Sequence, residues 1–360
     1  MPGRPSSTFA LGTVRRAAIA AAAALFLVGP GTVFAQTELI VYTAADRGEL
    51  GRFKAAFEYD NKDIRIRWVR DLAERIVERL IAEKAAPKAD VVWGVAATSL
   101  LRLAGEGHFQ PYAAKGLKGL DVGLRGKGDP PVWIGQRAWV GAICFNTAAA
   151  KKDGLAPPKS WHDLLDPTFK GKIVMPDPAS TRTGFLAVSA WIQLWGEAAA
   201  WAFMDRLHEN VAIYTRSGGK PCRLVLRNGY RAGLSFTYMA LRLKAEADGI
   251  DIIAPEEGVG WDLEATAILR GTPKLEAARR LVDWSIGATA ARLYARRHGI
   301  FAGGEAAKPP RVFPKDMRRH MIKNDFAWAA ANRLRIIAEW RRRYGGKVEP
   351  GGWRNGKEGR

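Results

Sequence analysis

The N-terminal part of this sequence alternates between short β-prone segments and longer segments in which apolar residues have helical spacing. The β-prone segments are Glu38–Thr43, Ile64–Val69 and Ala89–Trp93, and a helical stretch follows each of them, for example Gly48–Tyr59. Parallel strands need a crossover of about a dozen residues or more, and such crossovers are right-handed in nearly all proteins. The alternation therefore predicts an α/β fold built on a doubly wound parallel sheet.

The carboxyl ends of these strands are candidate positions for a ligand. In doubly wound sheets, small molecules bind in the crevice outside the carboxyl ends of the strands. Thr43 and Ala44 follow from the first strand, and Trp93 ends the third. We therefore take these three residues as candidate ligand-binding residues, although a tryptophan that ends a buried strand is equally compatible with a place in the core.

The stretch Met175–Phe185 has the composition of an anion-binding helix start. A strand leads into hydroxyl residues and a glycine, and the helical run 186–194 follows directly. The first amide groups of a helix have no intrahelical acceptor, and the helix dipole adds partial positive charge there, so they can hold an anion. The candidate residues are Ser180, Thr181, Arg182, Thr183 and Gly184. The alternative is simple capping, because Ser and Thr are common at helix starts.

Two further strand ends carry candidate residues. Ser217 and Gly218 lie in a glycine-rich turn after the strand 211–215, where backbone amide groups could donate to the same anion. An ordinary surface turn is the alternative. Tyr238 closes the strand 233–238 at a sheet edge, where it would offer a flat face and a hydroxyl to a ligand.

The first 35 residues have the pattern of an export signal. Arginines precede the apolar run Ala17–Val28, and Val33–Ala35 supplies small residues where a signal peptidase would cut. The apolar run stops short of the roughly 20 residues that a membrane-spanning helix needs. We therefore predict a signal peptide over residues 1–35 and a mature, soluble, periplasmic protein.

The charge balance points to a small anionic ligand. The formal net charge is +20, from 56 Lys and Arg against 36 Asp and Glu, and the cations are scattered, with a concentration after Arg311. Export and this scatter both argue against a nucleic-acid partner. A positive field does raise the rate at which an anionic solute meets the protein.

The sequence offers no metal-binding or catalytic motif. Its five histidines are dispersed and it has no CxxC pair, so no usual metal-ligand spacing occurs. GxSxG, GxxxxGK[ST] and HExxH motifs are absent as well. We therefore predict a binding protein without cofactor, metal or enzymatic activity. Cys144 and Cys222 could form a disulfide in an exported protein or remain two buried thiols.

Several runs of residues resemble the periplasmic substrate-binding proteins of ABC importers, in the branch that includes ferric-iron, thiamine and polyamine binders. These runs are Asp90–Gly94, Trp161–Ile173 and Gly260–Ile268. Within that branch, three runs are most similar to the 2-aminoethylphosphonate binders, namely Pro178–Phe185, Tyr214–Cys222 and Trp261–Glu264. The resemblance covers most of the mature chain.

The resemblance implies a two-lobed periplasmic-binding-protein fold of type II, in which each lobe has a Rossmann-like doubly wound sheet. We expect a monomer that closes around a small solute and delivers it to an ABC permease in the inner membrane. After the signal peptide, the predicted parts are lobe 1 (36–138 and 250–310), lobe 2 (139–249), a basic C-terminal helical extension (311–344) and a disordered tail (345–360).

A phosphonate with an amine tail needs N–H and O–H donors for its head and a carboxylate or an aromatic face for its ammonium group. The candidates for the ammonium end are Trp93, Tyr238, Trp261, Asp262 and Glu264. Capping or surface pairing is the alternative for the two carboxylates. Ferric iron or another oxyanion is the alternative solute, but ferric-iron binders of this group typically use neighbouring tyrosines, and here methionine follows Tyr238.

Overall fold

In this computed structural model the described residues are 36–120, 122–303 and 307–350. The chain forms a single unit from Thr37 onward. The predicted signal peptide, residues 1–35, lies outside the described residues. Among the residues that are described, no helix is both long and apolar enough to cross a bilayer.

The first part of the sheet is built on the parallel strands expected from the alternating pattern, and we call it, with its helices, the first lobe. Strand β1 pairs in parallel with β2 and β3, and β10 continues the sheet beyond β3 in the antiparallel sense. The strands are β1 (Thr37–Thr43), β2 (Ile64–Arg70), β3 (Val91–Ala96), β4 (Phe109–Gln110) and β10 (Trp261–Leu269). The helices are α1 (Arg47–Asp60), α2 (Ala73–Ala82), α3 (Ala97–Gly105), α9 (Leu275–Ser285) and α10 (Ala288–Tyr294).

The second lobe contains the other part of the sheet, in the order β5-β8-β6-β7, with β9 also on β5. Strands β8, β6 and β7 are parallel, and β5 is antiparallel to β8 and β9. The strands are β5 (Ile134–Asn146), β6 (Ile173–Pro176), β7 (Val211–Thr215), β8 (Ala232–Phe236) and β9 (Ile250–Ile253). The helices are α4 (Thr147–Lys152), α5 (Arg182–Trp195), α6 (Glu197–Asn210), α7 (Lys220–Asn228) and α8 (Thr237–Glu246).

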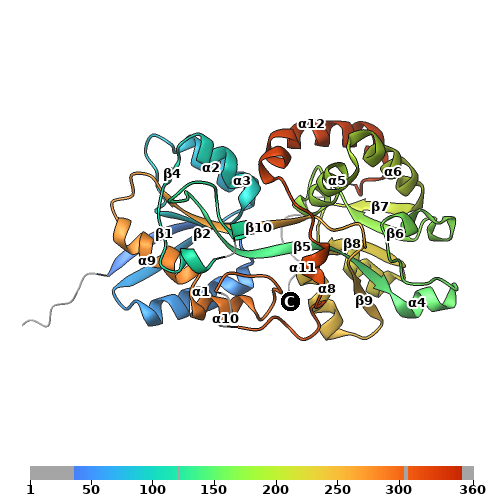
Figure 1. The fold of residues 1–360 in the computed structure, drawn as a ribbon, viewed down its shortest axis with the longest axis horizontal. Helices are drawn as coiled ribbons and strands as arrows, with labels where there is room; N and C mark the ends of the chain where they lie inside the picture. The colour runs from blue at the N-terminus through green and yellow to red at the C-terminus, as the bar shows by residue number, and fades with distance from the viewer. Residues whose placement is uncertain (1–35, 121, 304–306, 351–360) are drawn as a thin grey trace, which may run out of the picture. The chain divides into compact units, whose positions relative to one another are not determined.

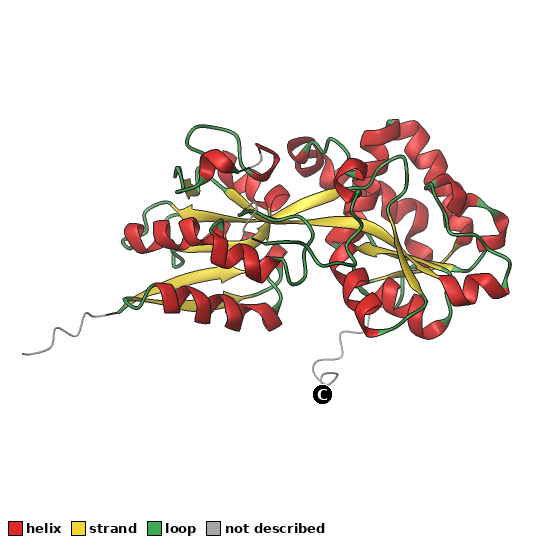
Figure 2. Cartoon of the chain, turned by 60° about the horizontal axis from the view of Figure 1, so that its bottom comes forward, coloured by secondary structure: helices red, strands yellow, loops and turns green. Residues whose placement is uncertain are grey.

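Strand β5 belongs to both lobes, as the long strand through the middle of Figures 1 and 2 shows. Its first half, up to Val140, pairs with β10, and its second half, from Gly141, pairs with β8 and β9. Because β9 pairs with the second half of β5, the chain returns to the first lobe only after Ile253. The boundary expected at residue 250 therefore falls a few residues too early.

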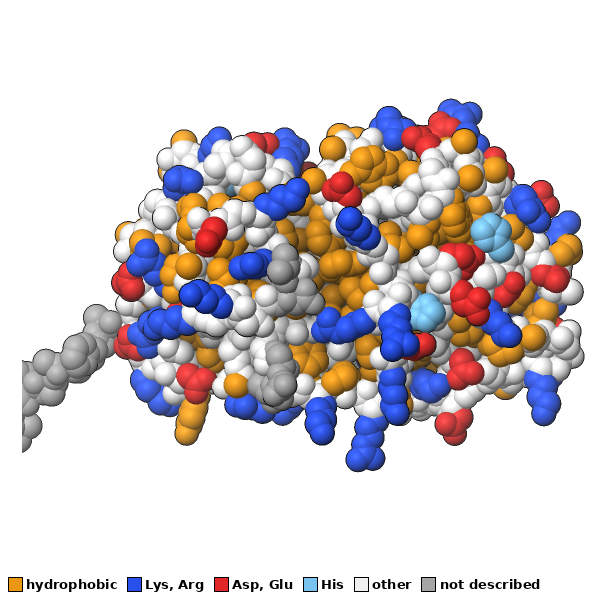
Figure 3. Space-filling view, in the orientation of Figure 1, with side chains coloured by type: hydrophobic (Ala, Val, Ile, Leu, Met, Phe, Trp, Pro, Cys, Tyr) orange, Lys and Arg blue, Asp and Glu red, His pale blue; other side chains and the backbone are white. Residues whose placement is uncertain are grey.

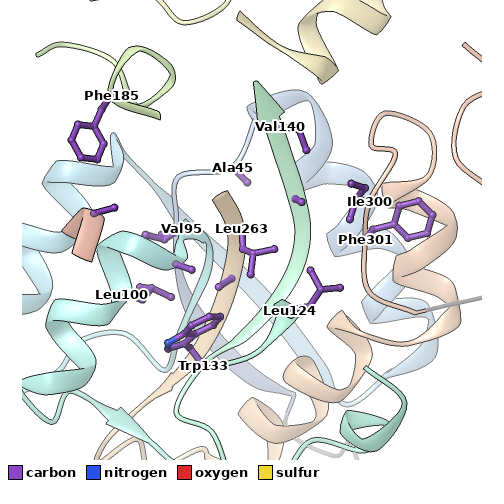
Figure 4. Close-up of a cluster of buried hydrophobic side chains, with 14 of the residues drawn as sticks. Ala45, Val95, Leu100, Leu124, Trp133, Val140, Phe185, Leu263, Ile300 and Phe301 are labelled. Carbon is purple, nitrogen blue, oxygen red and sulfur yellow. The ribbon is translucent and has the colours of Figure 1, made fainter. Parts of the chain in front are cut away.

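The elements of the first lobe form as their apolar patterns dictate. In α1, Leu50, Phe53 and Phe57 are buried, and the Asp46 side chain caps the helix by accepting from the Gly48 amide at 2.7 Å. Every residue of β3 is buried, as expected for a parallel strand covered on both faces. Figure 4 shows part of the resulting core.

The C-terminal segment contributes α11 (Met317–His320) and α12 (Phe326–Tyr344), and α12 packs on protein rather than standing apart. It contacts α3 of the first lobe and α5 of the second. On the second lobe its buried Trp340 packs against Tyr214, with ring centroids 4.9 Å apart. Within the helical extension predicted over 311–344, the long helix begins only at Phe326, where Asp325 caps it by accepting from the Trp328 amide.

The expected C-terminal tail also needs correction. The disordered tail expected from residue 345 is wrong for residues 345–350, since Gly345–Lys347 forms a 3-10 turn and Glu349 pairs with Lys220. Residues 351–360 lie outside the described residues. Helices α9 and α10 are separate, because Gly287 precedes α10 in an extended conformation. The segment after Ser160 forms two 3-10 turns, His162–Leu165 and Pro167–Phe169.

Candidate functional site

A cavity of about 460 Å³ is lined by residues of both lobes and lies at the N-terminal ends of four helices. These are α2, α5, α7 and α8, which follow the carboxyl ends of β2, β6, β7 and β8. Each helix start brings amide groups without intrahelical acceptors and partial positive charge. Of the predicted site residues, those that line the cavity are Ala44, Ser180, Thr181, Arg182, Thr183, Ser217, Gly218, Tyr238 and Glu264.

The start of α5 is held by hydrogen bonds to Asp177. The Thr181 hydroxyl caps the helix by accepting from the Gly184 amide at 2.9 Å and donates to the Asp177 carbonyl at 2.8 Å. The Ser180 hydroxyl donates to the Asp177 carboxylate at 2.7 Å. Capping, which was the alternative for this stretch, is therefore what the Thr181 hydroxyl does, while the Ser180 hydroxyl is bound to Asp177, and these hydrogen bonds hold the turn where it meets the cavity.

Glycines allow the turn before α7 to approach α5 closely. A Cβ on Gly218 would lie 2.3 Å from the Thr183 hydroxyl oxygen, and one on Gly184 would lie 2.4 Å from the Pro176 carbonyl oxygen. A side chain at Gly218 would push the turn away from α5, and one at Gly184 would push α5 away from the end of β6. Gly184 itself does not line the cavity; it lets α5 pack against the end of β6.

Arg182 presents unused donor capacity to the cavity. Its Nη1 is buried and has no hydrogen-bond partner among the described residues. The guanidinium stacks over Trp139, with 5.9 Å between Cζ and the ring centroid. A buried N–H without an acceptor costs free energy, so the arrangement favours an external anion at this position.

One side of the cavity is an aromatic wall formed by Trp139, Phe236, Tyr238 and His298. The Tyr238 and His298 rings are stacked with their centroids 5.4 Å apart. The Phe236 ring also stacks on Tyr238, with 6.1 Å between the two centroids. The Tyr238 hydroxyl accepts from Arg297 Nη1 at 2.7 Å. Burial raises the pKa of Tyr238, so its phenol stays protonated at neutral pH.

His298 is a second buried group with a nitrogen that makes no hydrogen bond. It is 5% exposed, and its Nε2 has no partner among the described residues. Burial and then the nearby charge of Arg137 hold its pKa well below the usual value. The ring is therefore neutral, and either tautomer leaves Nε2 able to donate to or accept from a guest.

Glu264 reaches the cavity from β10 as part of a buried charge cluster. Arg137 lies between two carboxylates, with Nη2 at 2.7 Å from both Glu49 and Glu264. Burial opposes the charge on Arg137, but Glu264 and Glu49 raise its pKa above the ordinary value. One arginine against two carboxylates leaves a net negative charge, and Glu264 carries the exposed part of it, with 20% of its side chain accessible.

Five predicted site residues do not line the cavity. They are Thr43, Trp93, Gly184, Trp261 and Asp262. Trp93 is 1% exposed and packs in the core against Phe53, with ring centroids 5.9 Å apart. The Thr43 hydroxyl accepts from the Ala45 amide at 3.1 Å, which shapes the turn after β1.

Trp261 and Asp262, which also lie outside the cavity lining, form hydrogen bonds to neighbouring segments. Trp261 donates from Nε1 to the Ile322 carbonyl at 2.8 Å and packs on Phe326. Asp262 is buried and accepts from the Thr98 hydroxyl at 2.6 Å. Burial raises the pKa of Asp262 to about 6.

Several cavity residues were not predicted, among them Trp139, Phe236, His298 and the arginines Arg70, Arg216 and Arg223. Phe236 ends β8 and could have been found by the same rule that selected Tyr238. His298 and Arg223 have no such signal, because they arrive from elements whose packing is not encoded in a local motif. The face shown in Figure 3 carries Lys and Arg at many scattered positions, so net charge alone does not locate the cavity.

Comparisons with known proteins agree with this architecture. Residues 86–329 match the family described as bacterial extracellular solute-binding protein. An uncharacterized protein of Haemophilus influenzae is 28% identical over 319 residues, which cover 86% of this chain and 91% of that protein. A protein of Sinorhizobium fredii, named as a probable ABC transporter periplasmic-binding protein, is 30% identical over 236 residues, or 62% of this chain and 63% of that protein.

Solved structures share the fold. The periplasmic binding protein AfuA of Actinobacillus pleuropneumoniae, solved with exogenous fructose-6-phosphate bound, has a TM-score of 0.75 at 24% identity, covering 86% of this chain and 99% of its own. Iron-bound HitA of Pseudomonas aeruginosa has a TM-score of 0.73 at 18% identity, covering 84% of this chain and 99% of its own. The two-lobed α/β periplasmic-binding-protein fold expected from the sequence is thus confirmed.

Proposed function

This chain belongs to the bacterial extracellular solute-binding proteins and is the solute-binding component of an ABC transporter. On this basis, we propose that it captures 2-aminoethylphosphonate in the cavity between its lobes. The observation that carries this proposal is the convergence of four helix starts on a cavity where Arg182 Nη1 is buried without a partner. Such a place suits a tetrahedral anion with several acceptor oxygens.

One carboxylate of the lining suits the amine. The net negative charge of the Glu49, Arg137 and Glu264 cluster reaches the cavity at Glu264. Glu264 comes from strand β10 of the scaffold, so it is positioned before the ligand arrives. An anionic head and a short cationic tail would each find a complementary wall.

Ferric iron fits these side chains less well. Iron ligation by tyrosine requires the phenolate, whereas burial raises the pKa of Tyr238 and Arg297 donates to its oxygen. No group of three His, Cys, Asp or Glu able to hold a metal occurs in the part of the chain that is described. We therefore rank iron below an organic phosphonate.

A larger phosphate ester, such as a sugar phosphate, is the second candidate. The volume of about 460 Å³ exceeds what a two-carbon phosphonate fills, and the AfuA structure contains fructose-6-phosphate. A sugar phosphate would use the same helix starts for its phosphate and would place its hydroxyls along the aromatic wall.

We further propose that the mature chain acts in the periplasm as a monomer, without catalysing a reaction, and passes its solute to an inner-membrane permease. The cavity provides binding groups, and a binding role requires none of the proton transfers that catalysis would need. Transfer to a permease follows from the transporter assignment.

Calorimetric titration of the mature chain tests the ligand. The panel is 2-aminoethylphosphonate, methylphosphonate, phosphate, fructose-6-phosphate, ferric citrate and putrescine. We expect the first to bind most tightly, and we expect R182Q to weaken it by tenfold or more, about the value of a hydrogen bond to a charged group. R52Q, at an exposed position outside the cavity, is the matched control. Heat from ferric citrate or putrescine alone would overturn the proposal, and tighter binding of fructose-6-phosphate would select the second candidate.

A further inference from the structure

Resting on the proposed function, we propose that Arg223 makes the cavity selective for doubly charged heads, phosphonate or phosphate, over singly charged heads of the same shape, such as sulfonate. Arg223 lies on the first turn of α7 and lines the cavity. It extends the anion site beyond the helix starts and Arg182, and none of the sequence motifs includes it.

The position of Arg223 faces the turn that binds the anion. Its Nη1 lies 3.6 Å from where a Cβ on Gly219 would be, so the guanidinium reaches back over the turn of Ser217 and Gly218. Gly219 allows this approach, because a side chain there would also collide with Met239, whose Cε would be 2.7 Å away.

Arg223 lacks a counter-charge in the protein. Among the described residues it has no hydrogen bond and no carboxylate within ion-pair distance. Its closest charged influences are cations, because burial and then Arg242 and Arg227 lower its pKa. A partly buried guanidinium beside two others is costly unless an anion compensates it.

The rest of the cavity wall also has more unpaired cations than unpaired carboxylates. Glu264 shares the cation of Arg137 with Glu49, and Glu74 lies 3.9 Å from Arg333, so neither carboxylate is paired with Arg223. Asp71 is the remaining carboxylate, and its side chain accepts from the Leu72 amide. On the cationic side, Arg70, Arg182, Arg216 and Arg223 all line the cavity without an ion pair among the described residues.

Two of these arginines point their donors at groups of the protein itself. Arg70 donates from Nε to the Ala45 carbonyl at 2.9 Å, and Arg216 donates from Nε to the Glu349 carbonyl at 3.1 Å. Arg182 and Arg223 keep unused donors. Hydrogen bonds to carbonyl groups orient Arg70 and Arg216 but do not neutralise their charges, so the wall keeps an excess of positive charge. A doubly charged head would offset this excess better than a singly charged one, and Arg182 and Arg223 have donors left to bind it.

Paired ligands that differ in charge alone test this selectivity. Taurine is 2-aminoethylphosphonate with a sulfonate head, and methanesulfonate matches methylphosphonate without the amine. At pH 8 a phosphonate carries close to two charges, since phosphate-type groups have a second pKa of about 6. We expect the wild-type chain to bind each phosphonate at least about tenfold more tightly than its sulfonate partner.

Substitutions at Arg223 then test whether this residue causes the selectivity for doubly charged heads. We expect R223Q to weaken 2-aminoethylphosphonate by about tenfold or more and taurine by less than about threefold, because only the second charge loses its partner. R52Q removes an exposed arginine outside the cavity and should leave both affinities unchanged. R223K retains the charge without the planar fork and should give an intermediate phosphonate affinity.

Equal losses for phosphonate and sulfonate in R223Q would overturn the inference, as would equal affinities of the wild-type chain for both heads. The unfolding temperature without ligand shows whether R223Q is folded; if it is not, R223K and the wild-type ratios decide. Selectivity within the methyl pair but no binding of 2-aminoethylphosphonate would refute the proposed ligand and support the role of Arg223. No binding of any phosphonate would overturn both.

Discussion

A disulfide between Cys144 and Cys222 joins the crossing strand β5 to the first turn of α7, with 5.4 Å between the two Cα atoms. The sequence left open whether these cysteines pair. The bond fixes α7 two residues after Lys220, where its N-terminal end and Arg223 meet the cavity. It therefore connects the stability of the second lobe to the geometry of the anion site.

Reducing this bond should destabilise the protein and weaken ligand binding. The bond closes a loop with a sequence separation of 78, and removing a native disulfide typically costs about 2–5 kcal/mol. We expect dithiothreitol, or the double variant C144S/C222S, to lower the midpoint of urea unfolding and the affinity for the solute. Dithiothreitol should have no effect on the double variant, and an unchanged affinity in that variant would show that α7 keeps its place without the bond.

Glu264→Gln should affect the amine end of the ligand selectively. The substitution removes the negative charge that reaches the cavity while Glu49 still pairs with Arg137. We expect the affinity for 2-aminoethylphosphonate to fall about tenfold and that for methylphosphonate to fall much less, as measured by calorimetry. Equal losses for both ligands would remove Glu264 from an amine-facing role.

Asp262→Asn should raise stability at neutral pH. Burial raises the pKa of Asp262 to about 6, above its value of 3.8 in the unfolded chain. Between these values the folded protein holds a proton that the unfolded chain has released, so stability from this group falls as pH rises from about 4 to 6. Asparagine does not titrate, so the substitution removes this loss. We expect the change in the free energy of unfolding caused by the substitution to be about 2–3 kcal/mol more favourable at pH 7.5 than at pH 4, since one pKa unit corresponds to about 1.4 kcal/mol.

Urea unfolding at a series of pH values measures this difference. The exposed Asp248→Asn substitution is the control and should leave the pH profile as it is in the wild type. A profile for Asp262→Asn that runs parallel to that of the wild type would show that Asp262 does not titrate in this range.

Two residues on α12 should differ sharply in their contribution to stability. Trp340 is 1% exposed and packs on Tyr214, whereas Leu334 is 82% exposed on the same helix. We expect Trp340→Ala to cost about 3–5 kcal/mol and Leu334→Ala to stay within about 0.5 kcal/mol in chemical unfolding. Similar small effects at both positions would mean that α12 contributes little to the fold in solution.

The sequence predicted the parts of the fold that depend on local pattern. Buried strands followed by amphipathic helices indicate parallel pairing directly, and β1, β2 and β3 pair as expected. The order in which distant strands join is not encoded locally, which is why β9 was assigned to the wrong lobe.

The same distinction applies to the cavity. The turns at Ser180–Gly184 and Ser217–Gly218 follow strand ends, and most of their residues line the cavity. Strand ends alone do not say which face a side chain takes, so Trp93 was a candidate although it packs in the core. His298 and Arg223 reach the cavity only through tertiary packing, and no local motif marks them.

The continuity of β5 constrains how the halves of this molecule can move. At the point where its pairing changes partner, the Gly141 amide donates to the Gly260 carbonyl at 2.8 Å, and a Cβ on Gly260 would lie 2.6 Å from the Leu186 carbonyl oxygen. Since β5 passes through unbroken, any rotation between the halves has to bend this backbone instead of sliding one surface over another. A bulkier residue at Gly260 would press on the Leu186 carbonyl of α5, so the crossing between the halves and the helix that supplies Arg182 to the cavity are tied to the same glycine.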